Sequence, residues 1–165
     1  MDSLLSRNRG LLSPDEEKEF VQLLGEAREQ PDDATDEEGN AVEAEPLPVR
    51  LVKLYKVLQL KVYDKSAAVN GFIIGGKSMW LTPNQRANFM LTIEAAQEKG
   101  VESVPFAGTT LPVATALAAL KAINLYAMQC VAVTDAHEAA IRAKRAQKTI
   151  EEYDFTAGYP AKLTF

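Results

Sequence analysis

One long amphipathic helix is the sequence feature that most constrains the fold of this chain. Between Pro112 and Arg145, apolar or small residues recur at steps of three or four, which is the spacing of one helical face. These residues are Val113, Leu117, Leu120, Ile123, Ala127, Cys130, Thr134, His137 and Ile141. A helix of about 34 residues would be roughly 50 Å long at 1.5 Å per residue, whereas a globular fold of this mass is only about 35–40 Å across. The helix must therefore protrude, kink or pack against copies of itself.

The two halves of this helix differ in character. The first half, from Val113 to Ile123, is apolar enough to belong to the core of the domain. The half beyond Cys130 is small and mixed and lacks the Leu/Ile heptads of a self-sufficient coiled coil, so we expect it to reach outward to a partner. Residues 135–138 (DAHE) resemble a capping box and mark the place where a kink is expected.

Two further helices are expected upstream. Ser13 can act as an N-cap with Pro14 at the first helical position, and the apolar spacing that follows predicts a helix to about Glu29. The segment 49–63 fits both a helical stripe and an alternating strand, and its length favours a helix. Four leucines ahead of the first helix are expected to pack on it or to anchor a partner; they are Leu4, Leu5, Leu11 and Leu12.

Glycine turns predict two β-hairpins. Gly75-Gly76 lies between two short β-rich runs in residues 71–81, and a tight hairpin turn needs such residues at positive φ. A helix from Thr82-Pro83 to Gly100 should follow, and residues 101–111 predict a second hairpin at Ala107-Gly108, with Pro105 on an edge strand. The chain is thus expected to be an α+β protein, mostly helical, with two short hairpins and one long C-terminal helix.

Charge and composition suggest three segments. Residues 1–47 carry 14 acidic side chains against 4 basic ones, whereas residues 48–165 carry 9 against 14. We expect an N-terminal arm and helix (1–30), an acidic flexible linker (31–48) and an α+β domain (49–165) that ends in an aromatic tail. The acidic arm is either kept extended by self-repulsion or docks on a basic surface of its own domain or of a partner. Nucleic-acid binding is not expected because the basic residues are scattered, nor is membrane insertion, because no uninterrupted apolar run approaches roughly 20 residues.

No catalytic, cofactor or metal site is expected. His137 is the only histidine, and the neighbouring Asp135 and Glu138 point away from it on a helix. Cys130 is the only cysteine, so an internal disulfide is excluded, and its mid-helix position is typical of a small core residue and not of a reactive thiol. Residues 75–78 (GGKS) lack the upstream glycine of a phosphate-binding loop and are interpreted as a hairpin turn.

The last 13 residues carry four aromatic side chains without a regular pattern, namely Tyr153, Phe155, Tyr159 and Phe165. Aromatic rings in such a segment must be buried, either over the core of their own domain or on a neighbouring subunit. Composition leaves both possibilities open.

Several segments together resemble a known family. They are YDKSAAVNGF (63–72), MWL (79–81) with Arg86, LYAMQC (125–130), VTDAH (133–137) and YDFTAGYP (153–160). Over about residues 60–163 the chain is similar to an uncharacterised domain of phage and prophage proteins of gut bacteria, often encoded beside tail-fibre or tail-fibre-assembly genes. The resemblance implies a compact domain of two hairpins and helices, and it carries no catalytic residues.

Two functions follow as hypotheses. The first is a phage-derived structural protein, not an enzyme, that joins a virion at a tail or fibre attachment point through contacts with other phage structural proteins and with copies of itself. The alternative is an acidic assembly chaperone that is absent from the mature particle. The expected location is the virion or, for a chaperone, the host cytoplasm.

Overall fold

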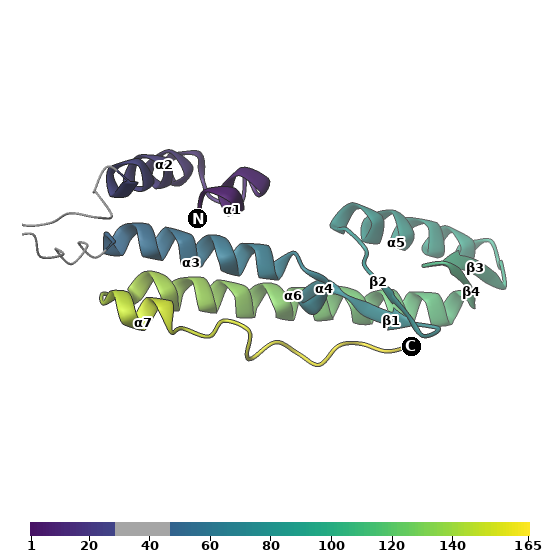
Figure 1. Cartoon of the computed structure of the whole chain (residues 1–165). Coiled ribbons are helices and arrows are strands. Elements are labelled where there is room, and N and C mark those ends of the chain that lie inside the picture. The colour runs from purple at the N-terminus through teal and green to yellow at the C-terminus, as the bar shows by residue number, and fades with distance from the viewer. Residues whose placement is uncertain (29–46) are drawn as a thin grey trace, which may run out of the picture. The chain divides into compact units, whose positions relative to one another are not determined.

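The computed structural model describes residues 1–28 and 47–165, and in this part of the chain it shows helices and two small antiparallel sheets (Figure 1). The helices are α1 (Asp2–Arg7), α2 (Pro14–Arg28), α3 (Val49–Asp64), α4 (Ala67–Asn70), α5 (Pro83–Glu98), α6 (Val113–Ala143) and α7 (Gln147–Glu151). The strands are β1 (Phe72–Ile74), β2 (Lys77–Met79), β3 (Ser103–Phe106) and β4 (Thr109–Pro112). The α+β, mostly helical class predicted from the sequence is confirmed.

The described chain forms two compact units, and each combines distant segments of sequence. Unit 1 contains Met1–Val62 and Ala136–Phe155, and unit 2 contains Tyr63–Asp135 and Thr156–Phe165. Helix α6 contributes residues to both. This division differs from the predicted boundaries at residues 30 and 48, because α1 and α2 share a core with later segments. Most of the predicted acidic linker, residues 31–46, lies outside the described residues.

Unit 1 has one apolar core. Its fully buried side chains come from α2, α3, the end of α6 and α7, and include Phe20, Leu51, Leu54, Leu58, Ile141 and Ile150. The helical alternative for residues 49–63 is therefore correct, since α3 buries a stripe at steps of three and four. Leu5 and Leu12 also lie in this core, so these two N-terminal leucines pack within their own chain.

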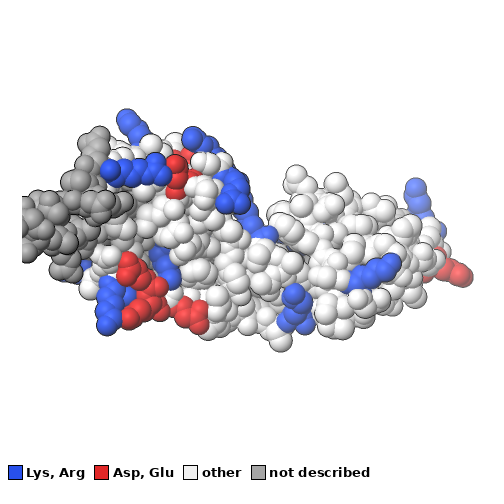
Figure 2. All heavy atoms as spheres, viewed as in Figure 1, with Lys and Arg blue, Asp and Glu red and all other residues white. Residues whose placement is uncertain are grey.

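Ion pairs link the helices of unit 1 to one another at its surface. Arg142 on α6 binds Glu16 of α2 at 2.7 Å and Glu138 at 2.6 Å, and Lys61 of α3 binds Glu138 at 2.7 Å. Arg50 forms a two-pronged pair with Glu19, both N···O distances being 2.8 Å. Part of the acidic N-terminal segment thus docks on basic side chains of its own chain, as one of the two sequence hypotheses proposed. Figure 2 shows charges of both signs over this unit.

Unit 2 is built on the two predicted hairpins. Strand β1 pairs with β2 from Phe72↔Met79 to Ile74↔Lys77, and Gly75 and Gly76 in the turn have φ of 54° and 73°, which only glycine adopts readily. Strand β3 pairs with β4, and α5 begins with a capping box between Thr82 and Gln85. The core residues shared by the hairpins, α5 and α6 are Phe72, Ile74, Leu81, Ile93, Val104, Phe106, Val113, Ala116, Ala119, Leu120 and Ile123.

Helix α6 is helical without interruption from Val113 to Ala143. It begins one residue after the predicted start, because Pro112 closes β4, and it ends two residues before Arg145. The capping-box pattern at residues 135–138 does not end a helix, since the Glu138 carboxylate accepts hydrogen bonds from Arg142 instead. By length and composition alone α6 would suffice to cross a membrane, a property that core helices of soluble proteins share.

The aromatic tail folds back on its own chain. Tyr153 and Phe155 pack on the core of unit 1. In unit 2 the backbone of Phe165 donates to the Ile73 carbonyl at 2.8 Å, and the Ile73 N–H donates to the Leu163 carbonyl at 2.8 Å. Of the two places that the sequence left open for these rings, the domain's own core is the one observed for Tyr153, Phe155 and Tyr159.

Candidate interaction surface on helix α6

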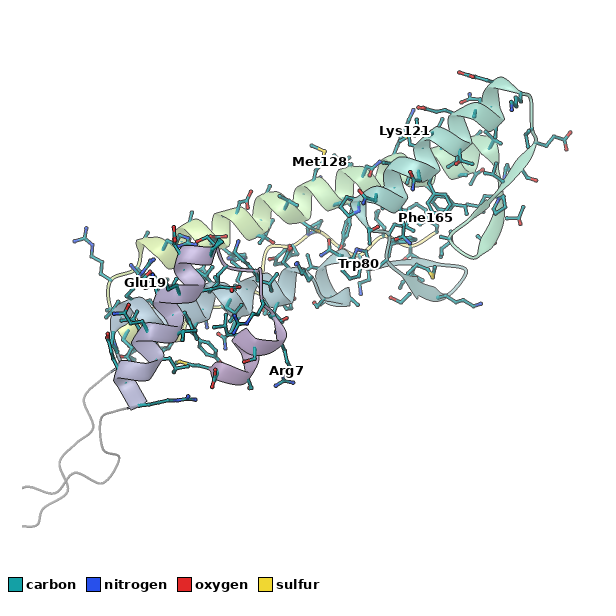
Figure 3. The ribbon with its side chains drawn as sticks, turned by 90° about the horizontal axis from the view of Figure 1, so that it is seen from above. Arg7, Glu19, Trp80, Lys121, Met128 and Phe165 are labelled. Atoms are coloured by element: carbon teal, nitrogen blue, oxygen red, sulfur yellow. The ribbon has the colours of Figure 1, made fainter. Side chains whose placement is uncertain are left out.

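A line of exposed residues runs along α6 within unit 2, and we call it the α6 seam. It consists of Lys121, Leu125, Met128, Val131, Ala132 and Asp135, all of which are exposed. Its three large apolar side chains are 58 % (Leu125), 71 % (Met128) and 54 % (Val131) exposed, and Met128 projects from the helix in Figure 3. Steps of three and four residues keep these side chains on one face.

The opposite face of the same helical segment is buried in unit 2. Ile123, Tyr126, Cys130 and Thr134 are at most 7 % exposed. The Tyr126 hydroxyl donates to the Val69 carbonyl at 2.7 Å, and the Cys130 thiol lies 3.6 Å from the same oxygen. Burial raises the pKa of Tyr126 to about 12, so its hydroxyl keeps the donated proton at physiological pH.

A second hydrogen-bonded group holds the last turns of this segment. The Thr134 hydroxyl lies 2.7 Å from Asp64 Oδ1 and 2.9 Å from the Tyr159 hydroxyl, and the Tyr159 ring packs edge-on against Tyr63 at 5.7 Å. Rotating α6 to bury the seam would break these bonds and those of Tyr126. The apolar seam is therefore held exposed to solvent by a fixed scaffold, which makes it the candidate interaction surface.

A shallow hollow of about 420 Å³ lies along the seam, next to α5. Its apolar wall is formed by Ala127, Met128, Val131 and Ala132, and Arg86, Asn124 and Asp135 supply its polar edge. The Arg86 guanidinium is held by a 2.9 Å hydrogen bond to the Leu81 carbonyl, and burial lowers its pKa. The hollow thus offers an apolar floor with groups of both charges at its rim.

A different hollow of about 500 Å³ lies around Trp80 in the same unit. Its walls include Gln85, Phe89, Pro105 and Thr110, and the Trp80 side chain is 46 % exposed. Phe89 and Phe106, with ring centroids 5.2 Å apart, form its aromatic base. This surface is partly polar, and none of the residues that line it carries a charged side chain.

The residues singled out by sequence have structural partners. His137 Nδ1 lies 2.8 Å from the Tyr153 hydroxyl, and the two rings meet edge to face at 5.6 Å. Cys130 is fully buried, and burial raises the pKa of its thiol. Residues 75–78 are the β1–β2 turn and the start of β2. Among the residues that the structure describes, no group of three or more His, Cys, Asp or Glu side chains could hold a metal ion.

The half of α6 beyond Cys130, which was expected to reach outward to a partner, is divided between the two units. From Ala136 onward the helix belongs to unit 1, where Ile141 is fully buried and Arg142 is ion-paired. The exposed apolar residues begin earlier, at Leu125. A second apolar line beside the main stripe was the signal in the sequence, and it was missed because only one face was expected to be apolar.

Comparison of the chain with protein-family models, with curated proteins and with solved structures gave no match.

Proposed function

We propose that this protein is a phage-derived, non-enzymatic component of a virion that acts through protein–protein contacts at a tail or fibre attachment point. The observation that carries the proposal is the α6 seam, three large apolar side chains held exposed by a hydrogen-bonded scaffold. The resemblance of residues 60–163 to a domain of phage and prophage proteins supplies the biological setting.

The seam has the chemistry of a protein-binding surface. Burying the exposed part of Leu125, Met128 or Val131 contributes at most about 1.5–3 kcal/mol each, since these side chains are already partly buried. Well-packed central anchors of this kind dominate binding at interfaces. Lys121 and Asp135 border the apolar part at either end, as polar rims border interface cores.

The alternative, an acidic assembly chaperone, is favoured by the excess of acidic side chains in residues 1–47. A protein of this kind would shield a basic or adhesive client and leave before the particle matures. Within unit 1, however, Glu16 and Glu19 already bind Arg142 and Arg50. These two carboxylates are therefore engaged inside the chain, which weakens the alternative for the described part of the acidic segment.

Binding to phage tail and fibre proteins, taken from the gene neighbourhood of this chain where it encodes them, tests the proposal. We expect capture of at least one of them by the purified protein, and at least a tenfold loss of affinity, equivalent to about 1.4 kcal/mol, in Met128→Glu. Leu91→Glu is the matched control, because Leu91 on α5 is 67 % exposed and lies outside the seam. Equal loss in both variants, or no binding by the wild type to any of these proteins, contradicts the proposal.

Mass spectrometry of purified particles separates the two functions. A virion component is present in stoichiometric amounts in mature particles, whereas an assembly chaperone is found only in infected-cell lysates and immature intermediates.

A further inference from the structure

The α6 seam has a regular order of side chains about its centre. Leu125 and Val131 lie three residues on either side of Met128, and Lys121 and Asp135 lie seven residues on either side. Along the helix, the seam therefore presents a positive charge, then three large apolar side chains, then a negative charge. Such a surface is complementary to a copy of itself turned end to end.

Pairing two such helices antiparallel about a two-fold axis at Met128 brings the large apolar side chains of one seam onto those of the other and places opposite charges together. Leu125 of each copy would meet Val131 of the other, and the two Met128 side chains would meet at the axis. Lys121 of each copy would face Asp135 of the other, once at each end of the contact. Two-fold interfaces use the same patch on both subunits in this way.

We propose that two copies of this chain associate through their α6 seams, antiparallel and centred on Met128. The proposal rests on the proposed function in taking the seam as an interaction surface, and it names a second copy as the partner.

The two charged groups are available for this contact. Neither Lys121 nor Asp135 forms an ion pair or side-chain hydrogen bond among the residues that the structure describes. By contrast, Lys61, Glu138 and Arg142 on other elements or farther along α6 are paired within 2.7 Å. Lys121 and Asp135 would thus gain partners without losing any.

The same charges select the orientation. In a parallel pair, Lys121 would face Lys121 and Asp135 would face Asp135, and like charges placed together at an interface suppress the wrong pairing. Ala132 in the seam and Ala118, which is exposed one helical turn before Lys121, leave room for two helices to approach closely.

The length of the seam argues against a lipid bilayer as its partner. From Lys121 to Asp135 the helix rises about 21 Å at 1.5 Å per residue, which is shorter than the roughly 30 Å hydrocarbon core of a membrane. Both ends of this segment carry a charge, and its other face is committed to the core of unit 2. Protein is therefore the favoured partner.

Charge reversal in analytical ultracentrifugation tests the pairing. We expect the wild type to show a concentration-dependent monomer–dimer equilibrium. Lys121→Glu and Asp135→Lys should each weaken the dimer about tenfold or more, since each places two like-charged pairs at the interface. The double variant Lys121→Glu/Asp135→Lys should return the dissociation constant to within about threefold of the wild type, roughly 0.7 kcal/mol. Leu91→Glu should leave it unchanged.

Cysteine cross-linking tests the antiparallel register. Two cysteines form a disulfide only when their Cα atoms lie within about 7 Å. Under mild oxidation Met128→Cys should cross-link to itself, Lys121→Cys alone should not, and a mixture of Lys121→Cys with Asp135→Cys should form the mixed dimer. The native Cys130 is fully buried and serves as the background control. Positions 121, 128 and 135 are all exposed, and circular dichroism identifies any variant that misfolds.

Two results would overturn the pairing: a monomer at every concentration, or self-cross-linking of Lys121→Cys in preference to the mixed dimer. If the protein is strictly monomeric but still binds a tail or fibre protein, and Met128→Glu weakens that binding, only the pairing is wrong. If it is strictly monomeric and binds none of these proteins, the proposed function is wrong as well.

Discussion

The two units of this protein are stabilised by different polar chemistry. Every ion pair found among the described residues lies in unit 1, including the Arg142–Glu16–Glu138–Lys61 group. In unit 2 the long-range side-chain hydrogen bonds come from hydroxyl and thiol groups, with Tyr126 and Thr134 at their centre. The difference shows how the acidic and basic halves of the sequence are used: their charges meet in unit 1, whereas the face of unit 2 seen in Figure 2 carries only scattered charged side chains. Unit 1 should therefore respond to pH through these ion pairs.

The largest effect is expected from Phe20→Ala in unit 1. Phe20 is fully buried between α2 and α3, so its removal should destabilise the unit by about 3–5 kcal/mol. Hydrogen exchange should show the loss in amides of α2 and α3. Fluorescence of Trp80, the single tryptophan, should report that unit 2 is preserved. Val21→Ala, at a 52 % exposed neighbouring position, is the control. Equal loss of protection in both units would show that they do not unfold separately.

Arg142→Met should destabilise unit 1 by about 1–2 kcal/mol at neutral pH, since hydrogen bonds to charged groups stabilise by up to about 3 kcal/mol and partial exposure screens them. Burial opposes ionisation of Glu16 and Glu138. Bonds from Arg142 to both, and from Lys61 to Glu138, outweigh it and lower their pKa below the usual 4.5. A lowered pKa stabilises the folded state above pH 4.5, and that stabilisation is lost as pH falls through the folded pKa.

The effect of Arg142→Met should therefore shrink in denaturant titrations below pH 4.5. Arg145→Met is its control, because Arg145 is exposed and has no ion-pair partner among the described residues. A cost that stays constant with pH would contradict the assigned role of the carboxylates.

Tyr126→Phe should destabilise unit 2 by about 1 kcal/mol, because it removes the donor to the buried Val69 carbonyl. With a pKa of about 12, Tyr126 stays protonated at acidic and neutral pH, so the cost should be the same at pH 4 and pH 8 when followed by Trp80 fluorescence. A cost that varied over this range would mean that charge contributes to unit 2 after all.

The smallest effect is expected from Lys148→Ala. Its pair with Glu152 is 3.8 Å long, and the two side chains are 83 % and 66 % exposed. Such surface pairs contribute about 0.3 kcal/mol or less at physiological salt, so thermal unfolding should not change measurably. A clear drop in the unfolding temperature would show that this exposed ion pair stabilises unit 1 more than surface pairs usually do.

Local signals in the sequence were enough to predict most elements. Pro14 and Thr82-Pro83 mark helix starts, Gly75-Gly76 marks a turn with positive φ, and the stripe in residues 49–63 gives α3. These features depend on neighbours a few residues apart, so no tertiary information is needed.

Long-range pairing could not be predicted in the same way. The bond between Thr134 and Asp64, the Arg142–Glu16 pair and the return of the tail to Ile73 each join residues far apart in sequence. Nothing in local periodicity specifies which partner a side chain meets. The second apolar line on α6 is visible in the sequence, but which face stays exposed depends on which one the hairpins and α5 cover.

The way each unit is completed has a consequence for synthesis of the chain. Unit 1 needs residues 136–155, and unit 2 needs Thr156–Phe165, whose backbone pairs with Ile73 and Gly75. During translation, α1, α2 and α3 leave the ribosome long before the segments that cover them. The core of unit 1 cannot close until Ile141 and Ile150 have emerged, and nascent chains that end before residue 155 should expose apolar surface that chaperones recognise.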